Sequence, residues 1–488
     1  MKRIKRLHLL AISFLIIGTS LGGSITSLAG ESKSHPCCEE KWVKFIHVEG
    51  KIEECHDVIQ TGNGDYVLLI HSVNNYPDWC GDIRLVCLDR EGSIKWDRTY
   101  GREKADIPWE IEQTHDGGFI IAGGTKSYGS GDGDAWLIKT DENGVEEWNK
   151  TYGGRYEDLA LCVCQTEDGY ILAGYTLSFS WEHYVPIGWV IKTDKNGNEM
   201  WNRTFGKRGN ALHFRWVYQS KDGGYFIVGN LARLTHPNPN EWDITNVDIC
   251  LIKLDGEGNE VWNKTLDYSE IDWVDGATST IDGGIVIAGY TEEYSYPVMC
   301  IIKVDGDGNV EWKKTFKEGV HATWGFSVQQ TMDGGFIVAG AKEEFDILTS
   351  LPMSYGWLIK LDKDMNEEWN HSYNVIGGFW NLIAPFRVKQ TSDGGYILVG
   401  TLDMMFLEDL GFRMIGAIAV KTDSIGRTKD FQLKLCTFTY LYGFVKWFAH
   451  KLFHGRHSYK KSMPLQSHTW YSLIPDRSML PIHFSAMN

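Results

Sequence analysis

The chain has 488 residues, 43% of them hydrophobic, and carries a formal net charge of −16. This acidity argues against a nucleic-acid partner, because binding to phosphates requires a basic surface. The sequence also contains no P-loop, no Gly-x-Gly-x-x-Gly motif after a predicted strand and no His-Glu-x-x-His motif, so the common signatures of nucleotide-binding and zinc-peptidase domains are excluded.

Residues 1–29 have the pattern of an export signal. Four basic residues within the first six precede an apolar run over residues 7–17, and Ser27-Leu28-Ala29 matches a small-residue cleavage site. An uncleaved membrane anchor is the alternative, since the weakly apolar stretch is about long enough to span a bilayer. In both cases we expect the following domain outside the cytoplasm, secreted or on the extracytoplasmic face of the membrane, with residues 30–39 as a linker.

One unit of sequence is repeated along most of the chain, and residues 113–153 are its clearest copy. The turn Gln113-Thr-His-Asp-Gly-Gly118 and the turn Asp141-Glu-Asn-Gly144 supply residues that suit tight hairpins. Four strands are predicted around these turns, at residues 109–113, 119–123, 134–141 and 146–152. One copy therefore predicts a small four-stranded antiparallel sheet.

The opening turn occurs seven times, each copy 51 to 60 residues after the last. The copies begin at Gln60, Gln113, Gln165, Gln219, Ser279, Gln330 and Gln390. Seven in-phase copies of this length are typical of sheets repeated around an axis. The sequence therefore predicts an all-β fold, a seven-bladed β-propeller of four-stranded antiparallel blades over residues 40–429.

The seventh copy ends at Asp423-Ser-Ile-Gly426 without the tryptophan strand that completes the others. The segment Glu40-Lys-Trp42-Val-Lys-Phe45 is a spare strand of the same pattern. Pairing it with the last copy closes the ring and removes an exposed sheet edge. The alternative is that residues 427–435 form a strand of their own.

Ten cysteines are compatible with disulfides outside the cytoplasm. Five of them lie near the amino terminus, and we expect these to staple the closing strand: Cys37, Cys38, Cys55, Cys80 and Cys87. Cys250 and Cys300 instead occupy the position that Trp136 holds in its copy, which predicts small buried side chains.

Residues 430–488 form a basic tail without the repeat. Apolar residues between Phe438 and Leu452 fall at helical spacing and predict an amphipathic helix. This helix either lies in a membrane interface, with the contact made through residues 431–454, or docks on the propeller. Beyond Ser458 the sequence has no pattern, and we expect little order there.

In each copy the two tight turns fall at one end of the blade, so the long and dissimilar connections fall at the other. Binding residues are expected on such variable loops. Aromatic and acidic residues gather there, and the predicted ligand-binding residues are Trp79, Tyr128, Asp132, Trp181, Glu182, Trp242, Tyr294 and Tyr296. Aromatic faces with carboxylates suit a carbohydrate, and equally a cationic ligand or the surface of another protein. The alternative is that the acids keep the loops soluble while the aromatics fill the rim.

The turn that contains Asp305 and Asp307 is a candidate for weak calcium binding. These residues place oxygen atoms at alternate positions, as calcium-binding loops do. The turn lacks the glycine and the distal glutamate of such loops, and the same turn is Asp141-Glu-Asn-Gly144 in another copy. A plain hairpin turn is therefore the interpretation we favour.

The signatures Gln-Thr-x-Asp-Gly-Gly and Trp-Leu-Ile-Lys-x-Asp-x-x-Gly-x-x-x-Trp resemble those of uncharacterised secreted repeat proteins of archaea and bacteria. The resemblance covers residues 40–429 and implies a β-propeller, with little about activity. The element Asp141, Gly144, Trp148 is also similar to the tryptophan motif of quinoprotein alcohol dehydrogenases. That family has eight blades, with calcium and a quinone at its centre, whereas this chain has seven copies, so the quinone site is not carried over.

Three functions are compatible with these features. A non-catalytic surface or secreted binding scaffold is the interpretation we favour, and it predicts no cluster of buried, convergent acids or histidines near the axis on the variable face. A carbohydrate-active enzyme of the glycoside hydrolase kind would need such a cluster among its loop carboxylates. A quinone-dependent oxidoreductase would need an axial calcium site and a tryptophan stacking surface.

Overall fold

The computed structural model describes residues 41–48, 50–74, 80–234, 244–317, 322–345, 352–373, 381–406 and 412–428. These residues form 28 strands and no helix, so this part of the chain holds no helical segment that could cross a bilayer. The predicted export signal, the linker, and the basic tail with its membrane-contacting helix lie outside the described residues. So do two predicted ligand-binding residues, Trp79 and Trp242.

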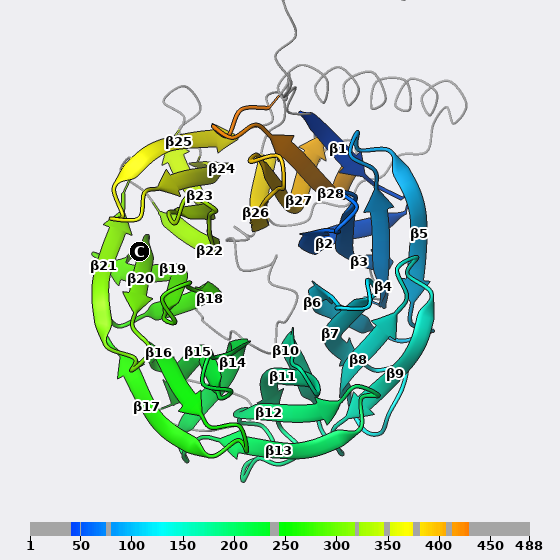
Figure 1. The fold of residues 1–488 in the computed structure, drawn as a ribbon, viewed down its shortest axis with the longest axis vertical. Helices are drawn as coiled ribbons and strands as arrows, with labels where there is room; N and C mark the ends of the chain where they lie inside the picture. Colours follow the sequence, from blue (N-terminus) through cyan, green and yellow to red (C-terminus); the bar gives the residue numbers. More distant parts are fainter. Residues whose placement is uncertain are drawn as a thin grey trace, which may run out of the picture. The chain divides into compact units, whose positions relative to one another are not determined.

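The strands form seven four-stranded antiparallel sheets around a common axis, which confirms the seven-bladed β-propeller (Figure 1). With the innermost strand given first, blade 1 consists of β2 (Lys51–Gln60), β3 (Tyr66–Asn74), β4 (Gly81–Leu88) and β5 (Ile94–Tyr100). Blade 2 consists of β6 (Asp106–Gln113), β7 (Phe119–Thr125), β8 (Asp134–Thr140) and β9 (Glu146–Tyr152). Blade 3 consists of β10 (Asp158–Gln165), β11 (Gly169–Thr176), β12 (Ile187–Asp194) and β13 (Glu199–Phe205). Blade 4 consists of β14 (Asn210–Gln219), β15 (Tyr225–Leu234), β16 (Ile244–Leu254) and β17 (Glu260–Leu266). Blade 5 consists of β18 (Asp272–Ser279), β19 (Ile285–Glu293), β20 (Tyr296–Val304) and β21 (Val310–Phe316). Blade 6 consists of β22 (Thr323–Gln330), β23 (Phe336–Phe345), β24 (Pro352–Leu361) and β25 (Glu367–Tyr373). Blade 7 is β26 (Asn381–Gln390), β27 (Tyr396–Phe406), β28 (Phe412–Thr422) and β1 (Trp42–Ile46).

Blade 7 takes its outermost strand from the other end of the domain. Residues 42–46 of β1 pair antiparallel with residues 417–421 of β28. The Trp42 indole also donates a hydrogen bond to the carbonyl oxygen of Arg90 in blade 1, at 2.7 Å. Closure by the N-terminal strand is therefore confirmed. Residues 427–428, the described part of the alternative strand, are not in a strand.

The repeated tryptophan of each outermost strand packs on the next blade. A Cβ on Gly197 would lie 2.6 Å from the ring of Trp148, and Gly197 has a φ of +72°. Both the indole and the left-handed turn therefore favour glycine there. The same contact joins Trp42–Gly92, Trp96–Gly144, Trp201–Gly258, Trp262–Gly308 and Trp369–Gly426. Only Trp312 meets a larger residue among these described boundaries, Met365.

The glutamine of the opening turn links neighbouring blades. The side-chain oxygen of Gln165 accepts a hydrogen bond from the backbone N–H of His115 at 2.9 Å, and that of Gln60 accepts one from Ser392 at 2.7 Å across the ring closure. Together with the indole–glycine contact, this gives the repeat signature a structural explanation.

A buried lysine in the third strand pairs with the aspartate of the opening turn. Lys192 has a side chain only 2% exposed, and its ammonium lies 2.6 Å from Asp168. Equivalent pairs are Lys139–Asp116, Lys253–Asp222, Lys303–Asp282, Lys360–Asp333 and Lys421–Asp393. Blade 1 replaces both partners, with Cys87 and Asn63. Replacing the pair together avoids a buried charge without a counter-charge.

The expected disulfide staple is wrong for the described cysteines. Cys55, Cys80 and Cys87 are all free thiols. Cys55 packs in the core between blades 7 and 1, whereas Cys87 packs in the core between blades 1 and 2, so these two thiols lie on opposite faces of blade 1. Cys250 and Cys300 are buried, as predicted.

Candidate functional site

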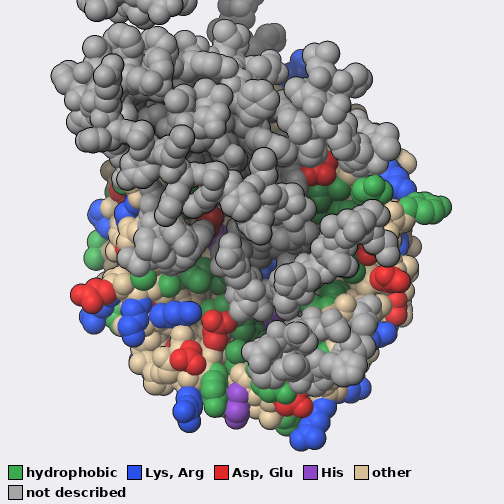
Figure 2. Space-filling model, turned by 180° about the vertical axis from the view of Figure 1, so that it is seen from behind, with side chains coloured by type: hydrophobic (Ala, Val, Ile, Leu, Met, Phe, Trp, Pro, Cys, Tyr) green, Lys and Arg blue, Asp and Glu red, His purple; other side chains and the backbone are tan. Residues whose placement is uncertain are grey.

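The tight turns lie at one end of every blade, the uniform face, and the longer loops and the linkers between blades lie at the other end, the variable face. Six predicted ligand-binding residues are described there: Tyr128 and Asp132 in blade 2, Trp181 and Glu182 in blade 3, and Tyr294 and Tyr296 in blade 5. Figure 2 shows acidic and basic side chains interspersed, not segregated, around the rim of the described residues.

The loops of blades 2 and 3 are joined through the linker between these blades. We call residues 126–133, 153–157 and 177–186 together the blade 2–3 rim. Four hydrogen bonds fasten it: Ser130 Oγ to Gly154 O (3.3 Å), Asp132 N to Arg155 O (3.2 Å), Tyr156 N to Ser178 Oγ (2.9 Å) and Leu177 N to Glu157 O (2.9 Å). These hydrogen bonds join the loop that carries Asp132 to the start of the loop that carries Trp181 and Glu182. A Cβ on Gly206, in the linker to blade 4, would lie 3.7 Å from the Trp181 ring.

Aromatic rings cover much of the blade 3 part of this rim. Trp181 is 50% exposed and Phe179 is 49% exposed. The ring of Phe179 rests on the buried Trp189, with centroids 5.5 Å apart. Beside them, the rings of Tyr156 and His183 stack at 4.4 Å. Sequence reasoning left Tyr156 and His183 out, because their contact joins a linker to a loop in the next blade.

Tyr128 packs against neighbouring side chains, and its role in ligand binding stays a prediction. Its ring centroid lies 5.1 Å from that of the buried Trp136, and the Arg102 guanidinium lies over it at 4.6 Å. The ring is therefore already packed against two side chains and supports the loop. Asp132, in contrast, is exposed.

A pair of carboxyl groups lies beneath the rim. Asp134 and Asp158 are 2% and 0% exposed, and a Cβ on Gly153 would lie within 2.6 Å of an oxygen of each. Backbone N–H groups use these oxygens: Ser130 donates to Asp134, and Gly154 donates to Asp158 at 2.8 Å. The pair therefore clamps the linker. Asp134 begins the third strand of blade 2 and Asp158 begins the first strand of blade 3. An aspartate at these two strand starts was the sequence signal that could have predicted the pair.

Stability should depend on the titration of Asp134. Burial raises the pKa of this carboxyl to about 6 from its ordinary value of 3.8; the hydrogen bond from Ser130 opposes the rise, and the charge of Asp158 adds to it. The folded chain then binds this proton more tightly than the unfolded chain, so stability falls as the pH rises from about 4 to about 6. Asp134→Asn keeps an acceptor for Ser130 and removes the titration.

We expect urea denaturation to show Asp134→Asn more stable than the wild type at pH 7 and less dependent on pH between 4 and 6. The exposed neighbour Asp132→Asn is the control and should follow the wild type. An Asp134→Asn variant with the wild-type pH profile would contradict this assignment.

The blade 5 residues lie apart from the rim. Tyr294 is 91% exposed and Tyr296 is 52% exposed. Tyr294 and Ser295 have φ angles of +51° and +65°, as in the two-residue turns that connect paired strands. The Lys317 ammonium lies 5.6 Å from the ring of Tyr294. These two tyrosines sit on the β19–β20 hairpin, two blades from Trp181.

The predicted calcium turn is organised as a hairpin. One carboxylate oxygen of Asp305 accepts hydrogen bonds from the backbone of Asp307 and Asn309, at 2.9 and 2.8 Å, and the other accepts one from the Asn309 amide at 3.0 Å. These hydrogen bonds hold the pKa of Asp305 below its usual range. Both oxygens already have partners, and calcium binding by Asp305 and Asp307 stays a prediction.

Two groups of ligand-type side chains converge among the described residues. Glu54, His56 and His71 bring their donor atoms within 4.8 Å of one another on the two inner strands of blade 1. Only His71 of these three residues is buried, and the expectation that no buried cluster lies near the axis on the variable face stays a prediction. In the second group, Asp248 with Asp267 and Asp272, the Arg233 guanidinium lies 2.6 Å from Asp248, so a cation is already present.

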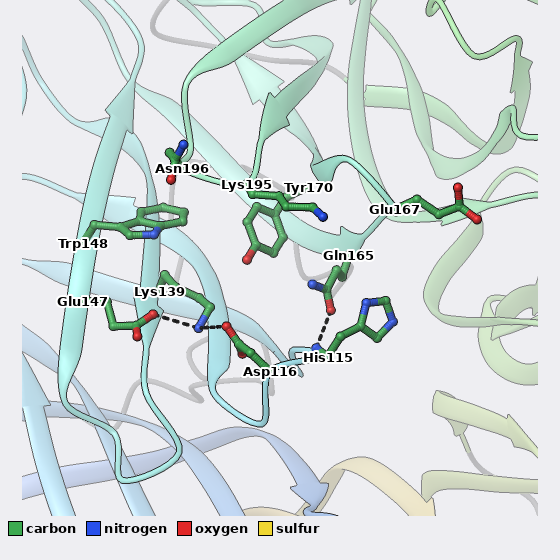
Figure 3. A pocket seen from close by; sticks show the side chains of 10 residues that line it. All are labelled: His115, Asp116, Lys139, Glu147, Trp148, Gln165, Glu167, Tyr170, Lys195 and Asn196. Atoms are coloured by element: carbon green, nitrogen blue, oxygen red, sulfur yellow. Dashed lines mark hydrogen bonds and ion pairs between the residues drawn. The ribbon is translucent and has the colours of Figure 1, made fainter.

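A crevice of about 440 Å³ opens between blades 2 and 3 on the uniform face (Figure 3). In it Lys139 lies between Asp116 and Glu147, 3.0 Å from each carboxylate, and Gln165 accepts the hydrogen bond from His115 (Figure 3). The ion pair of the lysine lies within one blade and the glutamine hydrogen bond joins two blades, and both recur in other copies of the repeat. We therefore assign the crevice to the scaffold.

Neither a family model nor a curated protein matches the sequence. Similar solved structures include the periplasmic gluconolactonase PpgL of Pseudomonas aeruginosa (10% identity, 74% of this chain and 98% of that chain covered, TM-score 0.41). Others are an α-L-arabinanase of Penicillium chrysogenum (12%, 62% and 93%, 0.38) and a lignostilbene dioxygenase of Pseudomonas brassicacearum (9%, 69% and 92%, 0.36). At these identities and TM-scores the similarities carry no argument about activity, substrate or cofactor.

Proposed function

We propose that this protein binds a carbohydrate at the blade 2–3 rim. The observation that carries the proposal is the half-exposed indole of Trp181, on a loop fixed by its own hydrogen bonds. Within this loop Ser180 N donates to Leu177 O at 3.3 Å, and Val185 N donates to Glu182 O at 2.8 Å. An indole held in this way stacks on the C–H face of a sugar ring, and a preorganised loop loses little entropy on binding.

The neighbouring side chains supply the rest of a sugar site. Phe179 extends the apolar surface, and the carboxylates of Asp132 and Glu182 lie on the same rim as acceptors for hydroxyl groups. Aromatic rings with carboxylate acceptors suit a neutral saccharide better than an anionic one, because the carboxylates of Asp132 and Glu182 would repel a negatively charged sugar.

The proposed role is binding without hydrolysis. The carboxyl pair nearest to the rim, Asp134 and Asp158, is buried under Gly153 and engaged by backbone N–H groups. A glycosidase needs two carboxyl groups that reach the scissile bond. The export-signal pattern of residues 1–29 supports a location outside the cytoplasm, where polysaccharides are accessible.

A glycan array, followed by calorimetry with the tightest-binding oligosaccharide, tests the proposal. We expect Trp181→Ala to weaken binding by at least about 10-fold, the usual effect of removing an aromatic anchor. Tyr294→Ala is the matched control, since it removes an even more exposed aromatic ring two blades away, and it should bind like the wild type. Absence of any glycan ligand, or equal binding by the wild type and Trp181→Ala, would overturn the proposal.

A further inference from the structure

A cluster of two histidines and one glutamate lies near the axis in blade 1, away from the blade 2–3 rim. Glu54 and His56 belong to β2, the innermost strand, and His71 belongs to β3, which pairs with it (Figure 1). Glu54 and His71 are direct partners across the two strands. A β-bulge at His56 shifts the register between Cys55 and Asp57, and this extra residue brings the His56 side chain to the same group.

His71 is buried without a hydrogen-bond partner. It is 5% exposed, and neither of its ring nitrogens has a donor or an acceptor within hydrogen-bond distance. The nearest carboxylate oxygen, that of Glu54, lies 3.6 Å from Nδ1. Leaving a buried polar atom unsatisfied costs about 1–3 kcal/mol, so such an atom in a folded protein calls for an explanation.

Gly81 leaves room for the imidazole of His71, and Trp109 packs against the ring of His56. A Cβ on Gly81 would lie 2.5 Å from Nε2 of His71, so a glycine is required where the ring packs. The ring of His56 meets that of Trp109 on β6 edge to face, with centroids 5.7 Å apart. The guanidinium of Arg387 interacts electrostatically with His56, and its Nε lies 3.8 Å from a carboxylate oxygen of Asp57.

The donor set is that of a transition-metal site. Two imidazoles and one carboxylate with open positions bind zinc, iron or a neighbouring divalent metal, whereas calcium and magnesium prefer oxygen ligands alone. Histidine must be neutral to bind a metal.

We propose that Glu54, His56 and His71 form a binding site for one divalent first-row transition-metal ion. The metal satisfies the buried nitrogen of His71 and takes the place of the missing hydrogen bonds. Three protein ligands leave at least one coordination position for water or another ligand, as in metal sites that carry chemistry. This site is independent of the proposed carbohydrate-binding rim.

Titration of the full chain with Zn²⁺ by calorimetry, and with Co²⁺ by visible absorption, tests the proposal. The protein is prepared without a histidine tag and stripped of metal. We expect one Zn²⁺ per chain and visible cobalt bands of nitrogen and oxygen ligation. His71→Ala and the isosteric Glu54→Gln should each weaken binding by at least about 100-fold, more than the loss of an outer hydrogen-bond partner.

Two controls separate this site from other effects. His115→Ala removes an exposed histidine from the uniform face, and it should keep the wild-type metal affinity. Trp181→Ala should also keep it, so failure of carbohydrate binding and failure of metal binding are distinguishable. Circular dichroism checks that each variant is folded. Absence of stoichiometric binding by the wild type, or unchanged binding by folded Glu54→Gln, would overturn the proposal.

Discussion

A chain that begins at residue 48 should fail to reach the stability of one that begins at residue 40, with a loss of at least about 3 kcal/mol in the free energy of unfolding. Without β1, blade 7 loses its outermost strand and β28 becomes an exposed edge. The indole of Trp42 no longer packs on Gly92, and the ion pair between Lys41 and Asp423 is lost. Guanidinium denaturation of the two chains measures the difference.

Addition of a synthetic peptide of residues 40–48 provides the control for this deletion. Because β1 makes five consecutive register pairs with β28, the peptide should restore stability in a concentration-dependent manner. A peptide in which Trp42 is replaced by Ala should restore less. If the shortened chain unfolds at the same denaturant concentration as the longer one, closure by β1 is not needed for stability.

Trp136→Ala should destabilise the fold by about 3–5 kcal/mol, the usual cost of removing a large aromatic side chain from a packed core. Trp136 is 1% exposed and lies in the core between blades 1 and 2. Its indole N–H donates to the side-chain oxygen of Asn149 at 3.1 Å, and this acceptor loses its partner in the variant. Urea denaturation at pH 7 measures the loss.

Two other substitutions show whether the size of this effect comes from burial. Trp181→Ala removes the same side chain where it is half exposed, so it should cost less than about 1 kcal/mol. Cys250→Ala changes the equivalent core position of blade 4, which already holds a small residue, and should cost about 1 kcal/mol. If Trp136→Ala and Trp181→Ala lose the same free energy of unfolding, burial of Trp136 does not account for the effect.

The positions of His71 and His56 vary from one copy of the repeat to the next, so the repeat pattern did not single out this cluster. His71 occupies the position of Gly124 in blade 2 and of Ala341 in blade 6, and His56 is the bulge residue where blade 3 has Leu161. The ligand prediction concentrated on the loops and named Trp181 and Asp132, whose loops are joined through the linker between blades 2 and 3, and Tyr128, whose ring packs on Trp136. The metal-type cluster lies instead within strands, at positions where blade 4 also has polar residues, Asn230 and Arg215.

The sequence by itself determined the propeller, the number of blades and the closing strand. These properties depend on the residues of the tight turns and on the buried apolar runs, and each copy of the repeat contains both. The tertiary structure alone decided which groups meet: Asp134 with Asp158 between blades 2 and 3, the loop of Asp132 with the linker that follows blade 2, and Glu54 with His56 and His71 within blade 1. Such contacts depend on the relative placement of strands and on the direction that a bulge gives to one side chain, and neither is encoded in the spacing of residues along the chain.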